Sequence, residues 1–143
     1  MRLAGKVAFI SGPTGHLLGK YHLSRAGSGY KAKNGYAFLA SADEWFSPVA
    51  AEVGPDGNLW VAFCHGGCVT CFDANTGEQL RKVDLPCVET TACAFGGPNL
   101  DELYITTAKN DITEADLEKE PLAGCVFKAR VAVSGLPPVS FAG

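Results

Sequence analysis

The chain has little charge, no excess of positive charge and no long apolar run. Of its 143 residues 19% are charged, and 12 Lys and Arg residues against 15 Asp and Glu residues give a net charge of −3. No basic face is therefore expected, and neither nucleic acid nor an anionic membrane is predicted as a partner. No apolar run approaches the roughly 20 residues that span a bilayer. Residues 7–10, the apolar run near the N-terminus, are too few for a secretion signal. These absences predict a soluble, cytoplasmic protein.

Motifs of common enzyme classes are absent as well. The sequence contains no Gly-x-Ser-x-Gly elbow, no phosphate-binding loop and no dinucleotide fingerprint. The histidines His16, His22 and His65 fall in different predicted turns and strands, and they fit no hydrolase pattern. The sequence therefore predicts no catalytic residue.

A repeated turn-and-strand pattern is the strongest signal that is present. The string GPDGNLWVA at residues 54–62 returns in altered form as GPNLDELYIT at residues 97–106, with Trp60 and Tyr104 as matching aromatics 44 residues apart. A second strand follows each copy, GGCVTCFD at residues 66–73 and AGCVFKAR at residues 123–130. A period of about 40 residues is typical of β-propeller blades.

A weaker third copy lies near the N-terminus, where residues 6–21 align with residues 58–73. We therefore predict an all-β, single-domain partial or half propeller, with blade-like units at residues 5–48, 49–90 and 91–143. Propellers use roughly four to eight blades, so three blades imply a partner, a fragment or a departure from that form, and self-association into a closed ring is expected. The predicted strands are residues 7–10, 16–23, 36–40, 49–53, 59–63, 68–72, 80–85, 91–95, 103–107 and 126–131, with a helix at 114–119 in an acidic surface excursion.

Six cysteines are unusual for a chain of this size. Cys64, Cys68 and Cys71 lie near His65 and could suggest zinc, but Cys68 and Cys71 should point to opposite faces of one strand. Disulfides are the other alternative. Without a secretion signal, buried or half-buried free thiols are favoured over both.

From residue 54 to the C-terminus the chain closely resembles the end of the regucalcin/gluconolactonase family, the senescence-marker-protein propellers. The similarity lies in GNLWVAFCHGGCVTCFDANTGEQLRKVDLP, in TACAFGGPNLDELYITTA, in PLAGCVFK and in the closing SFAG. It implies a six-bladed propeller in which an axial divalent metal (calcium, zinc or manganese) assists hydrolysis of sugar lactones. The residues before 54, including GKVAFISGPTGHLLG, look more like a blade of large sugar-dehydrogenase-like propellers.

The resemblance also implies where the metal should bind, and one ligand is missing. The family's ligands are a Glu, an Asn and the Asp of a Pro-Asp-Gly motif on an innermost strand. Aligned through residues 59–62, that motif falls at residues 48–50, where Val49 replaces the carboxylate. Asp56 stands in a Pro-Asp-Gly string on the outward turn and does not inherit the role. Glu52, three residues beyond Val49, is the candidate metal ligand, with a solvated channel residue as the alternative.

Three hypotheses follow. The chain is a metal-dependent lactonase whose activity is impaired or absent in this chain alone, a non-catalytic half-propeller that self-associates, or a fragment or fusion without a function of its own. Asp43, Glu44 and Trp45 could form an acidic pocket with an aromatic wall, although an exposed loop is favoured.

Overall fold

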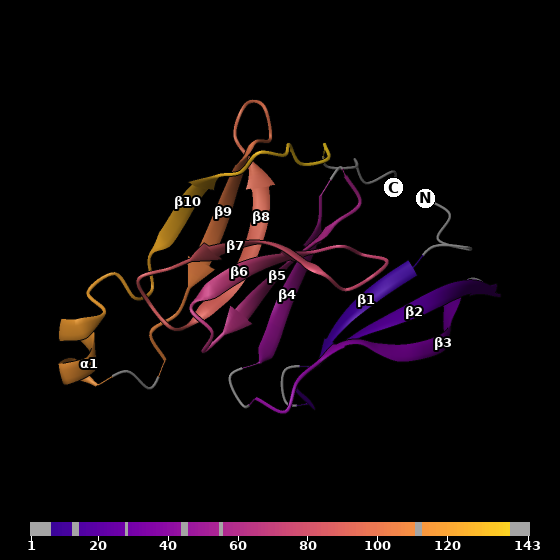
Figure 1. Cartoon of the computed structure of the whole chain (residues 1–143), viewed down its shortest axis with the longest axis horizontal. Coiled ribbons are helices and arrows are strands. Elements are labelled where there is room, and N and C mark those ends of the chain that lie inside the picture. Colours follow the sequence, from indigo (N-terminus) through magenta and orange to yellow (C-terminus); the bar gives the residue numbers. More distant parts are fainter. Residues whose placement is uncertain are drawn as a thin grey trace.

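A computed structural model describes residues 7–12, 15–27, 29–43, 46–54, 56–110 and 113–137. The predicted all-β class is confirmed, because the described residues form antiparallel sheets and one short helix. We call the sheets N-terminal, middle and C-terminal (Figure 1). No helix in the described part of the chain is long and apolar enough to cross a membrane.

The sheets follow one another along the chain. Their strands are β1 (Val7–Gly12), β2 (Leu17–Ala26) and β3 (Gly29–Ala40) in the N-terminal sheet, β4 (Ser47–Val53), β5 (Leu59–Cys64), β6 (Cys68–Phe72) and β7 (Gln79–Asp84) in the middle sheet, and β8 (Thr90–Gly96), β9 (Glu102–Thr107) and β10 (Val126–Arg130) in the C-terminal sheet. Helix α1 (Glu114–Lys119) lies between β9 and β10. The unit bounds at residues 5–48, 49–90 and 91–143 stay a prediction.

Turn residues set the ends of the hairpins. Gly27 has φ +60°, and Ala26 pairs with Gly29, so β2 and β3 form a long hairpin where the sequence predicted a flexible segment and a third strand starting only at residue 36. In the β6–β7 turn the Asp73 carboxylate accepts hydrogen bonds from the backbone N–H groups of Asn75 and Thr76, both at 2.8 Å. Such side-chain bonds to nearby backbone stabilise tight turns.

The first strand of each sheet lies on the inner side of the arrangement. β1 packs beside β4, and β4 packs beside β8 (Figure 1). β1 is therefore the counterpart of β4, because each stands at the inner edge of its sheet. The alignment of residues 6–21 with 58–73, which matches β1 with β5, is wrong by one strand.

Two apolar clusters cover the two faces of the middle sheet. One joins Trp60, Ala62 and Cys71 to Leu103 and Ile105 of the C-terminal sheet. The other joins Leu59, Val61 and Phe63 to the N-terminal sheet through Leu18 and Phe9. Burying a large apolar side chain contributes about 1.5–3 kcal/mol. Because both faces are covered, every residue of β6 is buried.

The N-terminal and C-terminal sheets each have one face that no described sheet covers. On the C-terminal sheet this face carries Tyr104, which is 38% exposed, and Val126. On the N-terminal sheet it carries Ile10, 51% exposed, opposite Gly19 in the register, and Tyr21 beside it. We call these the two open faces.

Candidate functional site

Glu52 lies on the inner strand β4, opposite Trp60 in the β4–β5 register. Its side chain is half-buried, and burial raises the pKa of its carboxyl group. Burial also raises the pKa of the Cys93 thiol to about 12, and the charge of Glu52 adds to this increase. Glu52 on β4 and Cys93 on β8, two strands that pack together, therefore interact electrostatically, and burial disfavours the charged form of each.

Val49 is at the point where the β4–β5 register shifts, between Pro48 and Ala50. It packs against the apolar cluster that contains Trp60. The residue at the position of the expected carboxylate is therefore an apolar contact between blades. A valine offers no oxygen ligand to a divalent cation.

Asp56 is a turn residue, as its place in the sequence indicated. Its Oδ1 accepts a hydrogen bond from the backbone N–H of Asn58 at 3.1 Å, and its Oδ2 accepts one from the Asn58 amide at 2.9 Å. These bonds stabilise the exposed turn between β4 and β5. The carboxylate of Asp56 is therefore engaged in local turn geometry.

The described residues do not fit a divalent metal. Nowhere in this part of the chain do three or more His, Cys, Asp or Glu side chains gather closely enough to hold an ion. Glu52 is paired with Trp60 in the register, and its charge acts on the Cys93 thiol. Hard cations such as calcium need several oxygen ligands, which Glu52 alone does not supply. The candidate ligand remains a prediction, and no catalytic step is assigned to it.

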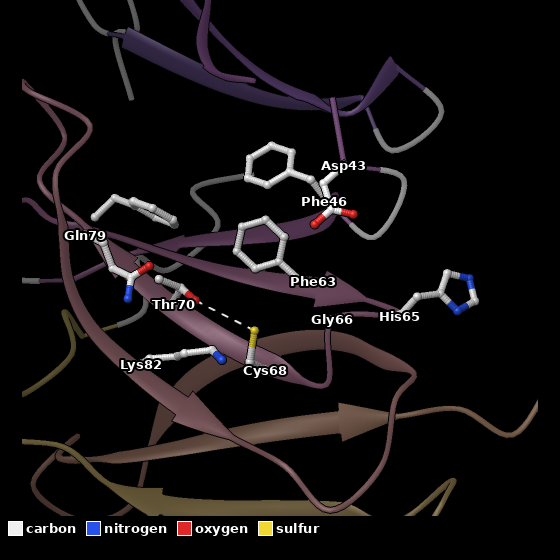
Figure 2. Close-up of a pocket in the computed structure, with 10 residues that line it drawn as sticks. Asp43, Phe46, Phe63, His65, Gly66, Cys68, Thr70, Gln79 and Lys82 are labelled. Atoms are coloured by element: carbon white, nitrogen blue, oxygen red, sulfur yellow. Dashed lines mark hydrogen bonds between the residues drawn. The ribbon is translucent and has the colours of Figure 1, made fainter. Parts of the chain in front are cut away.

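A pocket lies on the opposite side of the middle sheet, and its lining extends well beyond the acidic segment at Asp43 that the sequence indicated. Its volume is about 360 Å³. Figure 2 shows Asp43 and Phe46 above the Phe63 ring and Lys82 below it. The lining residues come from the β3–β4 loop, the β5–β6 turn and strands β5, β6 and β7: Asp43, Phe46, Phe63, His65, Gly66, Cys68, Thr70, Phe72, Gln79 and Lys82.

An irregularity in β7 explains why this pocket is hidden in the sequence. Gln79 pairs with Phe72 and Lys82 pairs with Thr70, because the β6–β7 register shifts between Cys71 and Phe72. Strict alternation would place Gln79 and Lys82 on opposite faces. The bulge brings them to one face. Of the predicted acidic pocket, Asp43 takes part here, whereas Glu44 and Trp45 lie outside the described residues.

Comparison with known proteins decides the family. The sequence profile described as "SMP-30/Gluconolactonase/LRE-like region" matches residues 6–109. The chain belongs to this family. The match begins well before residue 54, so it includes the strands of the N-terminal sheet. The similarity of that segment to sugar-dehydrogenase-like propellers stays a prediction.

Relatives of the SMP-30-like chain are longer than the chain itself. It is 43% identical over 89 residues to regucalcin of Oryctolagus cuniculus, covering 62% of this chain and 30% of that protein. It is 41% identical over 114 residues to regucalcin of Sus scrofa, covering 79% and 38%. The chain thus spans well under half the length of these relatives.

Solved propellers show the same arrangement of strands. A calcium-binding protein, regucalcin, from Agrobacterium tumefaciens superposes with a TM-score of 0.82 at 21% identity, covering 94% of this chain and 45% of that one. A luciferin-regenerating enzyme superposes with a TM-score of 0.74 at 26% identity, covering 90% and 42%. The predicted partial propeller is therefore confirmed.

The cysteines of this SMP-30-like chain are free thiols, as the sequence favoured. Cys68 faces the cluster with Phe63, whereas Cys71 faces the cluster with Trp60, so the two point to opposite sides of β6 as expected. Burial raises the pKa of Cys71 to about 11, with a further increase from the charge of Asp56. Cys125 is exposed.

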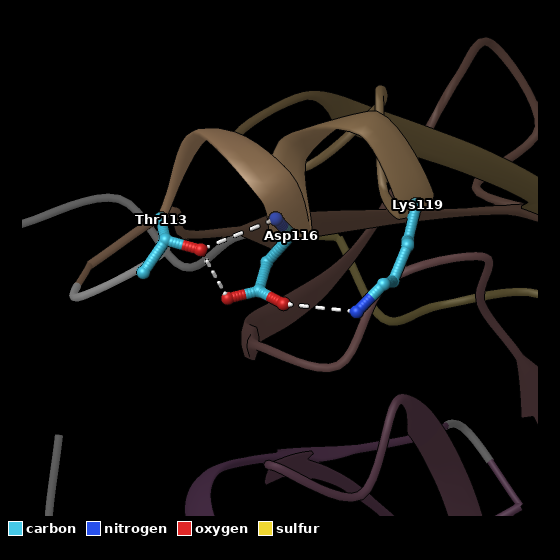
Figure 3. A network of polar contacts seen from close by, with 3 residues as sticks. All are labelled: Thr113, Asp116 and Lys119. Atoms are coloured by element: carbon cyan, nitrogen blue, oxygen red, sulfur yellow. Dashed lines mark hydrogen bonds and ion pairs between the residues drawn. The ribbon is translucent and has the colours of Figure 1, made fainter.

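The acidic excursion contains the predicted helix, and its polar contacts are local (Figure 3). The Thr113 hydroxyl caps the helix by accepting a hydrogen bond from the Asp116 N–H at 3.3 Å, and it donates to the Asp116 carboxylate at 2.6 Å. Lys119 donates to the same carboxylate at 3.4 Å. These bonds lower the pKa of Asp116. No residue of α1 is buried, which is typical of a solvated surface segment.

Proposed function

We propose that this chain supplies three blades of a closed ring, that a second copy supplies the rest, and that one copy alone does not hydrolyse lactones. The pair of open faces carries the first part of the proposal. One is the face on which a following blade would pack, and the other is the face on which a preceding blade would pack. In a dimer with twofold symmetry, the open face of the N-terminal sheet of each copy packs on the open face of the C-terminal sheet of its partner. These two contacts close the ring, and closed symmetry of this type is common.

The contrast between Trp60 and Tyr104 supports this assembly. Each lies on the second strand of its sheet. The residue directly before it, Leu59 or Leu103, packs toward the sheet that comes earlier in the chain. Trp60 is fully buried because the C-terminal sheet packs on it, whereas Tyr104 is 38% exposed. Burying the equivalent face would add apolar contact area and remove exposed β surface.

The catalytic part of the proposal rests on the inner strands. Val49 offers no ligand, and Glu52 is the carboxylate on the inner strand β4. Metal-dependent hydrolysis of a sugar lactone is the activity that the family resemblance implies. In this chain it would require carboxylates from another chain in addition to Glu52. Calcium, zinc and manganese are the ions to test.

Light scattering coupled to size exclusion tests the assembly. At micromolar concentration we expect a mass of about twice the 15.0 kDa of one chain. Ile10→Asp places a charge on an open face and should shift the mass toward one chain. Leu80→Asp is the matched control, because Leu80 is also exposed but lies on β7, away from both open faces. A stable monomer of the parent protein would rule out the closed dimer.

Lactone hydrolysis is assayed separately on the Ile10→Asp variant, in which a single chain is expected, with each metal and with a chelator. We expect no rate above the metal-free control. A metal-dependent rate that Glu52→Gln abolishes would overturn the non-catalytic part and identify Glu52 as a ligand. The assembly result is independent of this outcome.

A further inference from the structure

The pocket lies on the face of the middle sheet that packs toward the N-terminal sheet, and the two sheets differ in width. In the described part of the chain the N-terminal sheet has three strands and the middle sheet has four. Phe9, Phe38 and Phe46 pack against the cluster of β5 and β6 side chains, and no residue of β7 belongs to that cluster. The uncovered part of the β5–β7 face is the floor of the pocket, so a single chain forms the whole site.

One wall of this pocket is aromatic and fixed. The ring centroids of Phe46 and Phe63 are 5.0 Å apart, and those of Phe63 and Phe72 are 6.1 Å apart. Phe63 and Phe72 are 5% and 8% exposed, so packing restricts their rotamers. A flat ring can stack on such a wall without ordering new side chains, which lowers the cost of binding.

The polar groups of the pocket are mixed donors and acceptors with balanced charge. Thr70 and Gln79 can each donate and accept, Lys82 donates, and Asp43 accepts. The charge of Lys82 is already matched by Asp84, whose Oδ1 lies 2.6 Å from the Lys82 ammonium. An ionised ligand would gain little here, because no unmatched charge of one sign dominates the lining. A hydroxyl group, which both donates and accepts, suits these side chains.

We propose that this pocket binds a small, uncharged, single-ring compound that carries hydroxyl groups. Its ring stacks on the phenylalanines, and its hydroxyls bond to Thr70, Gln79 and Lys82. The cavity of about 360 Å³ is at the lower end of the usual range for small-molecule sites, which favours one ring over two. The site is separate from the inner strands, because Glu52 lies opposite Trp60 on β4 and is not among the lining residues.

Phenols and sugars both carry a ring with hydroxyl groups, and the probes distinguish between these two classes of compound. The ¹⁵N-labelled chain is titrated with catechol, with methyl glucoside and, as an anionic ring of similar size, with benzoate. We expect saturable amide shifts at residues 63–70 and 79–82 for at least one hydroxylated probe, with a dissociation constant on the order of 1 mM. Benzoate should bind at least several-fold more weakly.

Matched variants on β7 locate the binding. Lys82→Ala should weaken binding about five- to tenfold. Arg81 is a neighbouring exposed cation whose register partner is Cys71, so it lies on the other face of the sheet. Arg81→Ala should therefore leave binding unchanged. Gln79→Trp should fill the pocket and abolish the shifts, with Leu80→Trp as its control. The amide spectrum itself shows that each variant is folded.

Three results would overturn the proposal. They are the absence of saturable shifts with both hydroxylated probes, binding of benzoate as tight as theirs, and equal effects of Lys82→Ala and Arg81→Ala. A failure here leaves the ring-closure proposal untouched, because the pocket residues lie on neither open face.

Discussion

The middle and C-terminal sheets are built from similar sequence and differ in what covers them. The same turn, strand and aromatic recur in GPDGNLWVA and GPNLDELYIT, yet Trp60 is fully buried and Tyr104 is more than a third exposed. The difference lies in the next sheet, which packs on Trp60 and has no described counterpart at Tyr104. A blade sequence therefore specifies a blade, whereas burial depends on its neighbours.

The largest effect should come from the covered aromatic. Trp60→Ala is expected to lower the free energy of unfolding by about 3–5 kcal/mol, because it empties a core position shared by two sheets. Tyr104→Ala, which loses the hydrogen bond of its hydroxyl to Glu102 at 2.9 Å, should cost about 1 kcal/mol or less in the monomer. Urea unfolding followed by circular dichroism measures both.

This pair also reports on ring closure. If a second copy covers Tyr104, the cost of Tyr104→Ala should grow with protein concentration while that of Trp60→Ala changes little. Equal costs for the two variants in dilute solution would contradict the exposed position of Tyr104.

Thiol reactivity provides a second comparison of covered and uncovered positions. At pH 8 the exposed Cys125 should react with iodoacetamide at least tenfold faster than Cys71 and Cys93, whose burial raises the pKa to about 11 and about 12. Mass spectrometry of peptides after timed alkylation gives each rate. In denaturant the differences should disappear; if they persist, folding is not their cause.

The half-buried Glu52 should make the stability of the fold decrease between acid and neutral pH. Its folded pKa is raised above the value in the unfolded chain, so its favourable contribution is present below the unfolded pKa and is lost as pH rises through the folded pKa. Glu52→Gln should therefore be more stable than the parent at pH 7 and similar to it at pH 4. Thermal unfolding at the two values is the measurement. A variant that is less stable at pH 7 would indicate that the charge of Glu52 has a partner.

The smallest effect is expected on the open face of the C-terminal sheet. Lys128 donates to Glu102 at 3.0 Å and Tyr104 donates to it at 2.9 Å, and both bonds lower the pKa of Glu102. The resulting stability is present above the unfolded pKa and is lost as pH falls through the folded pKa. Glu102→Gln should flatten the loss of stability between neutral pH and acid. An unchanged acid titration would show that these bonds add nothing in solution.

Much of the fold could be predicted from the sequence, because each blade repeats its own turn signals. Strands β5, β6 and β9 fall within a residue of their expected bounds. The third copy was misaligned by one strand, since β1 and β5 are both short apolar runs and only sheet pairing distinguishes an inner strand from the next one. The sequence also did not predict the long β2–β3 hairpin, because glycines between two polar segments are as typical of a flexible linker as of a tight turn.

The candidate sites were less predictable, because they depend on register. The bulge in β7 puts Gln79 and Lys82 on one face, and no pattern in residues 79–84 predicts this bulge. The shift at Val49 similarly depends on the pairing of β4 with β5. Val49 and Glu52 can be identified in the sequence through a family alignment, whereas their place relative to Cys93 depends on the packing of β4 against β8.

Helix α1 has a practical consequence. It buries none of its residues, and it belongs to a connection outside all three sheets. Exposed segments of this kind accept inserted sequence well. A fluorescent or affinity tag placed at residues 115–118 would therefore replace no buried side chain and no residue that lines the pocket, and two differently labelled copies could report their own pairing by energy transfer.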